Sequence, residues 1–197
     1  MVKIIDSQKY FNEIVNIAKI IDLKIIDKLL INIKKIQKKK GRIFFLGVGG
    51  SAGNCSHAVN DFRKLCGIEC YTPTDNISEL TARVNDEGWE TVFIEWLKIS
   101  NLSSKDAIFI LSVGGGDIKK NVSVNLINAI KFAKTKKSKI FGIVGRDGGY
   151  TKKNADCVVV IPNTNNSLVT PLSEAYQSVV WHYLVSDSRL QIKKTKW

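Results

Sequence analysis

The chain has 197 residues, enough for one domain whose hydrophobic core needs no disulfide or metal to hold it. It carries 30 lysine and arginine residues against 18 acidic ones, a formal net charge of +12. No basic stripe interleaved with aromatic residues accompanies this charge, which argues against nucleic-acid binding and favours attraction of small anions. No apolar run approaches a membrane span, and no signal peptide is recognisable. We therefore expect a cytoplasmic protein that binds neither nucleic acid nor a membrane.

The cysteines indicate a reducing compartment. There are four of them, Cys55, Cys66, Cys70 and Cys157, and their spacing is not that of a metal finger. Most lie in apolar or helical surroundings, which is typical of reduced thiols in a protein core.

The first predicted elements are one or two amphipathic helices within residues 7–38. Isoleucine and leucine recur there at helical spacing, at Ile14, Ile17, Ile21, Ile25, Leu29, Ile33 and Ile36. Such a stripe indicates packing against the rest of the domain or against another subunit. We expect a homo-oligomer with this segment in its interface, because a sheet with its own helices leaves the stripe no obvious place.

The rest of the chain alternates between strands and helices. We predict strands at residues 42–47, 68–71, 106–112, 139–144 and 157–161. We predict helices at residues 51–65, 76–84 and 89–100, from about 117 to 134, and from 170 to about 188, with a turn at 85–88. This alternation predicts an α/β fold, a doubly wound five-stranded parallel sheet flanked by helices. Residues 1–197 then form a single domain, with residues 1–39 as an N-terminal helical segment.

Two glycine-rich turns follow predicted strands. Gly47, Gly49 and Gly50 follow the first, and Ser51 stands where it would cap the next helix. Gly114–Gly116 follow the third strand. The carboxyl ends of parallel strands meet at one edge of a sheet, where free amides and helix N-termini attract anions. We therefore expect an anion site formed by both turns.

The ordered motifs resemble the sugar isomerase (SIS) domain family over residues 40–188. The leading pattern is Gly47-x-Gly49-Gly50-Ser51-Ala52-x(4)-His57-x(3)-Asp61. Further matches in the family's order are Asp75 with Leu80-Thr81-Ala82, Asn85-Asp86-x-Gly88, Ser112, Gly145-Arg146-Asp147-Gly148-Gly149, Glu174 and His182. An ordered set of this kind is more specific than any single motif.

The resemblance is closest to sedoheptulose 7-phosphate isomerases, also called phosphoheptose isomerases. It implies the SIS fold, a homotetramer with sites at subunit interfaces, and a phosphosugar aldose–ketose isomerase. The implied role is heptose biosynthesis for capsule or lipopolysaccharide. Several members of the family bind zinc, so the resemblance also implies a bound divalent metal, zinc.

The resemblance also implies roles for individual residues. The metal ligands would be His57, Asp61, Glu174 and His182, with Asp61 and His182 also the acid–base residues. The substrate-binding residues would be Gly49, Gly50, Ser51, Asn85, Asp86, Ser112, Val113, Gly114, Gly115 and Glu174. Two imidazoles and two carboxylates are a donor set that suits zinc.

Several residues depart from the family's pattern. Asp61 stands where the family has glutamate, Glu174 where it has glutamine, and Val48 where it has asparagine. The serine- and threonine-rich phosphate loop becomes Ser112–Asp117. Backbone amides with Lys119 or Lys120 offer a replacement for the lost hydroxyls, and Asp117 is expected to cap the following helix.

Two alternatives stay open at this point. One is an isomerase acting on another phosphosugar. The other is a non-catalytic SIS protein that binds a phosphosugar or a protein partner.

Overall fold

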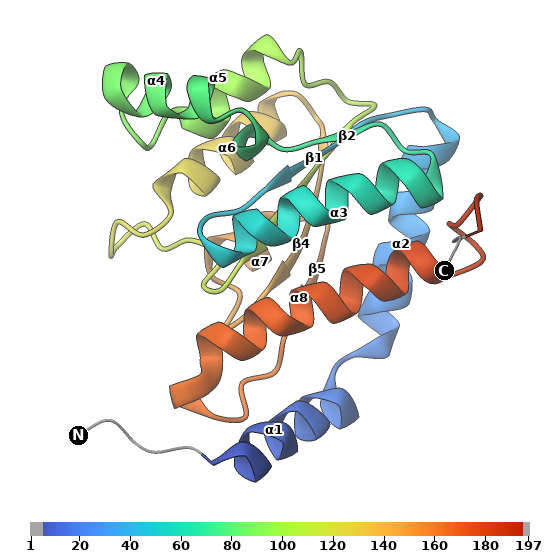
Figure 1. The fold of residues 1–197 in the computed structure, drawn as a ribbon. Helices are drawn as coiled ribbons and strands as arrows, with labels where there is room; N and C mark the ends of the chain where they lie inside the picture. Colours follow the sequence, from blue (N-terminus) through green and yellow to red (C-terminus); the bar gives the residue numbers. More distant parts are fainter. Residues whose placement is uncertain (1–5, 195–197) are drawn as a thin grey trace.

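The computed structural model describes residues 6–194, and its centre is one five-stranded parallel sheet in the order β2-β1-β3-β4-β5 (Figure 1). The strands are β1 (Ile43–Leu46), β2 (Cys70–Tyr71), β3 (Ala107–Ser112), β4 (Lys139–Val144) and β5 (Cys157–Val160). The α-helices are α1 (Ser7–Ile20), α2 (Leu23–Lys38), α3 (Gly50–Cys66), α4 (Ile77–Glu87), α5 (Val92–Ile99), α6 (Val124–Thr135), α7 (Gly149–Asn154) and α8 (Val169–Ser186). Short 3₁₀ turns lie at Pro73–Asp75 and Asn166–Leu168.

Helices cover both faces of the sheet because its strands are apolar on both sides. Alternate residues of a strand point to opposite faces. Ile43 and Phe45 of β1 join a core shared with α1, α2, α3 and α8, whereas Phe44 and Leu46 join a second core with α5 and α6. Figure 1 shows α3 and α8 side by side on the first of these faces. The predicted doubly wound α/β fold is confirmed.

The isoleucine stripe packs within the chain itself. Ile17, Leu29, Ile33 and Ile36 are buried, and Ile14, Ile21 and Ile25 pack partly against the same core. The helix breaks at Asp22, whose carboxylate accepts from the amides of Lys24 and Ile25 and so begins α2. The stripe has a place within its own chain, so it no longer supports an interface formed by this segment. The homo-oligomer stays a prediction.

Several element boundaries were predicted wrongly. Helix α5 begins at Val92 and not at residue 89, and α7 was not predicted. The expected turn at residues 85–88 is largely the last turn of α4, which ends at Glu87 before Gly88 at φ 87°. The helix expected from about residue 117 begins only at Val124. Asp117 and Val122 instead form an antiparallel bridge, and the Asp117 carboxylate accepts from the amides of Lys119 and Lys120. Asp117 thus closes a tight turn and does not cap a helix.

The four cysteines are free and buried among the described residues, as the sequence predicts. Burial raises the pKa of every one of these thiols, that of Cys66 to about 12. No helix of the described chain is long and apolar enough to cross a membrane.

The native protein should therefore resist thiol-reactive reagents at neutral pH, because the thiolate is the reactive form and the sulfur atoms are covered. A chromogenic disulfide reagent should report no fast-reacting thiol in the folded protein and all four in denaturant. A thiol that reacts at once in the folded protein would contradict this burial.

Candidate active site

A cavity of about 1290 Å³ opens at the carboxyl ends of the strands. In this strand order the winding reverses between β1 and β3, and ligands bind in the crevice outside that point. Residues that follow β1, β3, β4 and β5 line the cavity. They include Val48, Ser51, Ser112, Val113, Gly114, Gly116, Lys119, Lys120, Arg146, Tyr150, Lys153, Asn163, Asn166 and Thr170. Of the predicted substrate-binding residues, Ser51, Ser112, Val113 and Gly114 therefore lie at the cavity.

The two glycine loops at this edge interlock through their backbones. Gly115 has φ 69°, and a β-carbon there would lie 2.1 Å from the carbonyl oxygen of Gly148. Gly149 has φ 52°, and its β-carbon would lie 2.2 Å from the oxygen of Gly114. The amide and the hydroxyl of Thr151 both donate to the oxygen of Gly115. Gly115 therefore acts by letting the loops meet, and its own amide donates to Ser112 Oγ at 3.0 Å.

This packing predicts that alanine substitutions at two neighbouring glycines differ in their effect on the free energy of unfolding. Gly115→Ala should destabilise the protein by about 1–3 kcal/mol, because it meets both a left-handed backbone and a carbonyl oxygen. Gly114→Ala should change the free energy of unfolding by less than about 0.5 kcal/mol, since the nearest atom to its β-carbon would be Arg146 Cδ at 3.7 Å. Urea denaturation of both variants measures the difference, and equal effects would contradict the interlocked loops.

Ser51 does not cap α3, contrary to the sequence prediction. The cap position is Gly49, whose φ is 63°, and no side chain caps the helix there. Ser51 is buried in the first turn, and its hydroxyl accepts from Gln177 Nε2 at 3.1 Å. Asn54 Nδ2 donates to the backbone oxygen of Glu174 at 2.9 Å and to Gln177 Oε1 at 3.0 Å. This polar contact holds α3 and α8 together beside the cavity.

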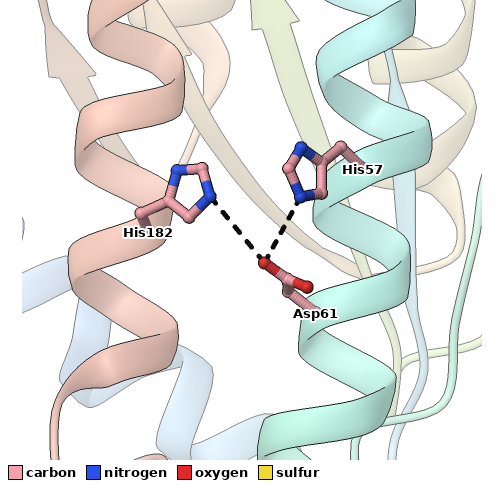
Figure 2. Close-up of side chains that lie close together, drawn as sticks. All are labelled: His57, Asp61 and His182. Carbon is pink, nitrogen blue, oxygen red and sulfur yellow. Dashed lines mark ion pairs between the residues drawn. The ribbon is translucent and has the colours of Figure 1, made fainter. Parts of the chain in front are cut away.

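His57, Asp61 and His182 meet where α3 and α8 run side by side, and Figure 2 shows both rings turned toward the carboxylate. Asp61 Oδ2 lies 3.7 Å from His57 Nε2 and 3.9 Å from His182 Nε2. One helical turn separates His57 from Asp61, which brings their side chains to the same face of α3. Packing of the two helices supplies His182.

The Asp61 carboxylate is the buried member of this cluster. Its side chain is 9% exposed, against 56% for His57 and 47% for His182. Asn60 Nδ2 donates to Oδ1 at 2.9 Å, which leaves Oδ2 facing the two imidazoles. The carboxylate is thus oriented from one side and open to the histidines on the other.

The tautomer of His182 follows from its hydrogen bond. Nδ1 lies 2.8 Å from the backbone oxygen of Ser178. A carbonyl oxygen only accepts, so Nδ1 carries the proton, and in the neutral ring Nε2 presents a lone pair toward Asp61. A lone pair and a carboxylate oxygen facing each other at 3.9 Å are complementary to a proton or a cation. This donor set fits a divalent metal.

The distances also fit a metal of zinc's size. Bonds of 2.0–2.2 Å in tetrahedral geometry put ligand atoms about 3.4 Å apart. The three ligand atoms lie within 4.8 Å of one another, with 3.7 and 3.9 Å to Asp61 Oδ2, so the imidazoles would have to move inward to share one ion. His57, Asp61 and His182 form a potential metal site of three ligands.

Other predicted site residues lie apart from this cluster. The Glu174 carboxylate sits over Gly50 at the start of α3, where a β-carbon on Gly50 would lie 2.5 Å from Oε2. Eight residues of helix separate Glu174 from His182, a rise of about 12 Å. Asn85 and Asp86 are exposed at the end of α4 and contact each other at 2.7 Å. Neither lines the cavity of its own chain.

The sequence motifs did not mark Trp181 or Arg146 as site residues. Trp181 is fully buried, with its ring stacked on His182 (centroids 3.5 Å apart) and edge-on to His57 at 4.7 Å. Its position next to His182 was the only available signal. Arg146 lines the cavity from the loop after β4.

A doubly wound sheet, a cavity between glycine loops and a His–Asp–His cluster further along α3 define the class: this is a protein of the SIS sugar-isomerase fold. A solved phosphoheptose isomerase from Neisseria gonorrhoeae has the same fold, with a TM-score of 0.77 at 22% identity over 89% of this chain and 92% of that one. No protein-family model matches the chain.

Curated relatives give the family. A phosphoheptose isomerase from Buchnera aphidicola is 31% identical over 70% of this chain and 69% of its own. The lincomycin biosynthesis protein LmbN of Streptomyces lincolnensis is 31% identical over 73% of this chain, and the match spans about half, 54%, of its length. The chain belongs to the phosphoheptose isomerase family, a family of isomerase enzymes.

Proposed function

We propose that this protein interconverts sedoheptulose 7-phosphate and a glycero-manno-heptose 7-phosphate through an enediol, in the cytoplasm, for the heptose of capsule or lipopolysaccharide. The observation that carries the proposal is the His57–Asp61–His182 cluster, which lies along α3 from a cavity built of glycine loops. The names of its relatives support the choice of sugar.

The chemistry needs a group that removes a proton from the carbon beside a carbonyl and returns it to the neighbouring carbon. Asp61 is the base in this proposal, because Oδ2 is held toward the open side of the cluster. His182 Nε2, 3.9 Å from Asp61 Oδ2, exchanges the proton of the sugar oxygen while no metal occupies its lone pair, and it becomes a ligand instead when a metal is bound. A divalent metal, when bound by His57, Asp61 and His182, would polarise the carbonyl oxygen. Asp61 has enough lone pairs to hold an ion and accept a proton.

The dimensions suit a substrate with a phosphate at one end and a carbonyl near the other. Ser51 lines the cavity, and His57 follows it by six residues, a rise of about 9 Å along α3. We place the phosphate at the Ser112–Gly116 loop and the carbonyl end toward the cluster. Glu174, whose carboxylate lies over Gly50 at the start of α3, then contacts the sugar hydroxyls as a substrate-binding residue, and its predicted metal role would require its side chain to move.

The homotetramer stays part of the proposal. Asn85 and Asp86 do not line the cavity of their own chain, so their predicted contact with substrate requires the cavity of a neighbouring subunit. Zinc likewise stays a proposal that rests on the donor set.

A panel of ketose phosphates tests the proposal. Purified protein is incubated with each sugar, and aldose formation is followed by NMR. We expect turnover of sedoheptulose 7-phosphate above the other sugars. Turnover of another phosphosugar alone would reassign the substrate. A non-catalytic phosphosugar-binding protein is a second candidate, because the phosphate loop has lost its hydroxyls, and binding without turnover of any sugar would favour it.

A further inference from the structure

Arg146 is a cavity-lining cation without a partner. Its side chain is exposed to the cavity and makes no hydrogen bond or ion pair with any residue in the part of the chain that the structure describes. The other four arginines all have partners: Arg42 pairs with Asp106, Arg83 with Glu79 and Arg189 with Asp187, and Arg63 donates to the backbone oxygen of Cys70. An unpaired guanidinium at a cavity wall is available to a ligand.

The backbone at Arg146 is fixed by close packing. A β-carbon on Gly145 would lie 2.1 Å from Ser173 Oγ of α8 and 2.9 Å from the oxygen of Val113. Arg146 itself has φ 51°, a left-handed conformation that a non-glycine residue adopts at some cost. The base of the side chain is therefore held by β4, α8 and the loop after β3.

The Arg146 side chain lies beside the glycine loop. Apart from the residues next to Gly114, its Cδ is the nearest described atom, at 3.7 Å, to the place where a β-carbon on Gly114 would stand. The amides of Gly114 and Gly116 have no hydrogen-bond partner among residues 6–194. Ser112 Oγ accepts from the amide of Gly115, so its own proton is available to donate. Ser112, Gly114, Gly116 and Arg146 thus line one cavity with donors that no described residue occupies.

The nearby acids do not neutralise this site. Asp117 accepts from the amides of Lys119 and Lys120, and Asp147 accepts from the amide of Gly149. Both carboxylates are thus committed to their own turns. Lys119 and Lys120 also line the cavity, but they sit on the turn at residues 117–122 and not on the packed loops.

We propose that Arg146 is the principal side-chain ligand of the substrate's phosphate. It takes the place of the hydroxyls absent from the Ser112–Gly116 loop. A planar guanidinium offers two parallel N–H donors to phosphate oxygens, and Gly114 leaves room for it beside the free amides. The inference rests on the proposed phosphosugar substrate, but it concerns only how the phosphate group is held.

Binding of inorganic phosphate to the purified protein tests the inference without isomerase activity. The ³¹P NMR signal is titrated for the wild type, Arg146→Gln, Arg146→Lys and the double variant Lys119→Gln/Lys120→Gln. Lys152→Gln is the matched control, since Lys152 is an exposed cation on the same segment that does not line the cavity. Circular dichroism checks that each variant is folded.

We expect Arg146→Gln to weaken phosphate binding about tenfold to hundredfold, the value of a charge-assisted hydrogen bond. Arg146→Lys should keep part of the affinity, and the control should stay within twofold of the wild type. Equal binding by Arg146→Gln and wild type would overturn the inference, as would loss of binding in the double lysine variant alone or no phosphate binding by the wild type. If phosphate binding depends on Arg146 but no sugar is turned over, the proposed function fails and this inference stands.

Discussion

Asp61→Asn should lower the turnover number of the isomerase by about a thousandfold, within the range of 10²–10⁴ that a positioned acid–base group contributes. The amide has nearly the shape of the carboxylate but neither accepts the substrate proton nor carries the charge that a cation requires. The fold should survive, because the side chain contacts mainly Asn60 and the two histidines. A coupled assay of aldose phosphate formation gives the turnover number.

Metal content separates the two roles of Asp61. Elemental analysis of protein purified without chelator should find less metal in Asp61→Asn, and none in His57→Ala or His182→Ala. Glu95→Gln serves as the control, because this carboxylate pairs only with Lys98 on the surface of α5. Full turnover in Asp61→Asn would remove both roles from the cluster.

Asp106→Ala should reduce the free energy of unfolding by about 3 kcal/mol, as expected when the buried carboxylate of a partly buried ion pair is removed. Asp106 is 2% exposed and stands just before β3. It accepts from the amide, Nε and Nη2 of Arg42 and from the amide and hydroxyl of Ser103. Arg42 also donates to the oxygens of Ser100 and Asn101 after α5. Removal of the carboxylate therefore removes the hydrogen bonds that connect the starts of β1 and β3 and the end of α5.

Urea denaturation measures this loss, and the Glu95→Gln variant should lose less than about 1 kcal/mol, because its ion pair is exposed. A loss below 1 kcal/mol for Asp106→Ala would contradict the structural role of the pair.

The same pair gives a pH dependence. Burial alone would raise the pKa of Asp106, but hydrogen bonds from Arg42 and Ser103 lower it below the ordinary value of 3.8. The folded state therefore favours the ionised form. The stabilisation is complete above the unfolded pKa and is lost as pH falls through the lower folded pKa. The difference in stability between wild type and Asp106→Asn should accordingly shrink only in strong acid.

Local pattern was sufficient to predict the sheet. The strands β1, β3 and β4 are apolar runs that end at turns, and burial on both faces makes such runs recognisable, whereas the edge strand β5 alternates buried and half-buried residues. The start of α6 was not predictable from the sequence. Asp117 would suit a helix cap, yet its bridge to Val122 delays α6 to Val124. The sequence holds no local signal for that bridge.

In the candidate site, too, local spacing predicted some neighbours, and the packing of distant segments supplied the others. His57 and Asp61 lie one turn apart on one helix, so the sequence alone predicts that they meet. His182 joins them through the packing of α8 on α3, and only the resemblance to a family pointed to it. Glu174 belongs to the same helix as His182, but the helical rise keeps it at the other end of the site. The position of Arg146 depends on the contact between the two glycine loops, which no spacing in the sequence reveals.

Conversion of sedoheptulose 7-phosphate in D₂O, followed by NMR, tests the central claim most directly. Proton transfer through an enediol at an exchanging base predicts an aldose 7-phosphate that carries deuterium at the carbon next to its aldehyde. It also predicts that Asp61→Asn forms this product about a thousandfold more slowly. Absence of any aldose product from metal-loaded wild-type protein, or an undiminished rate in Asp61→Asn, would contradict the account.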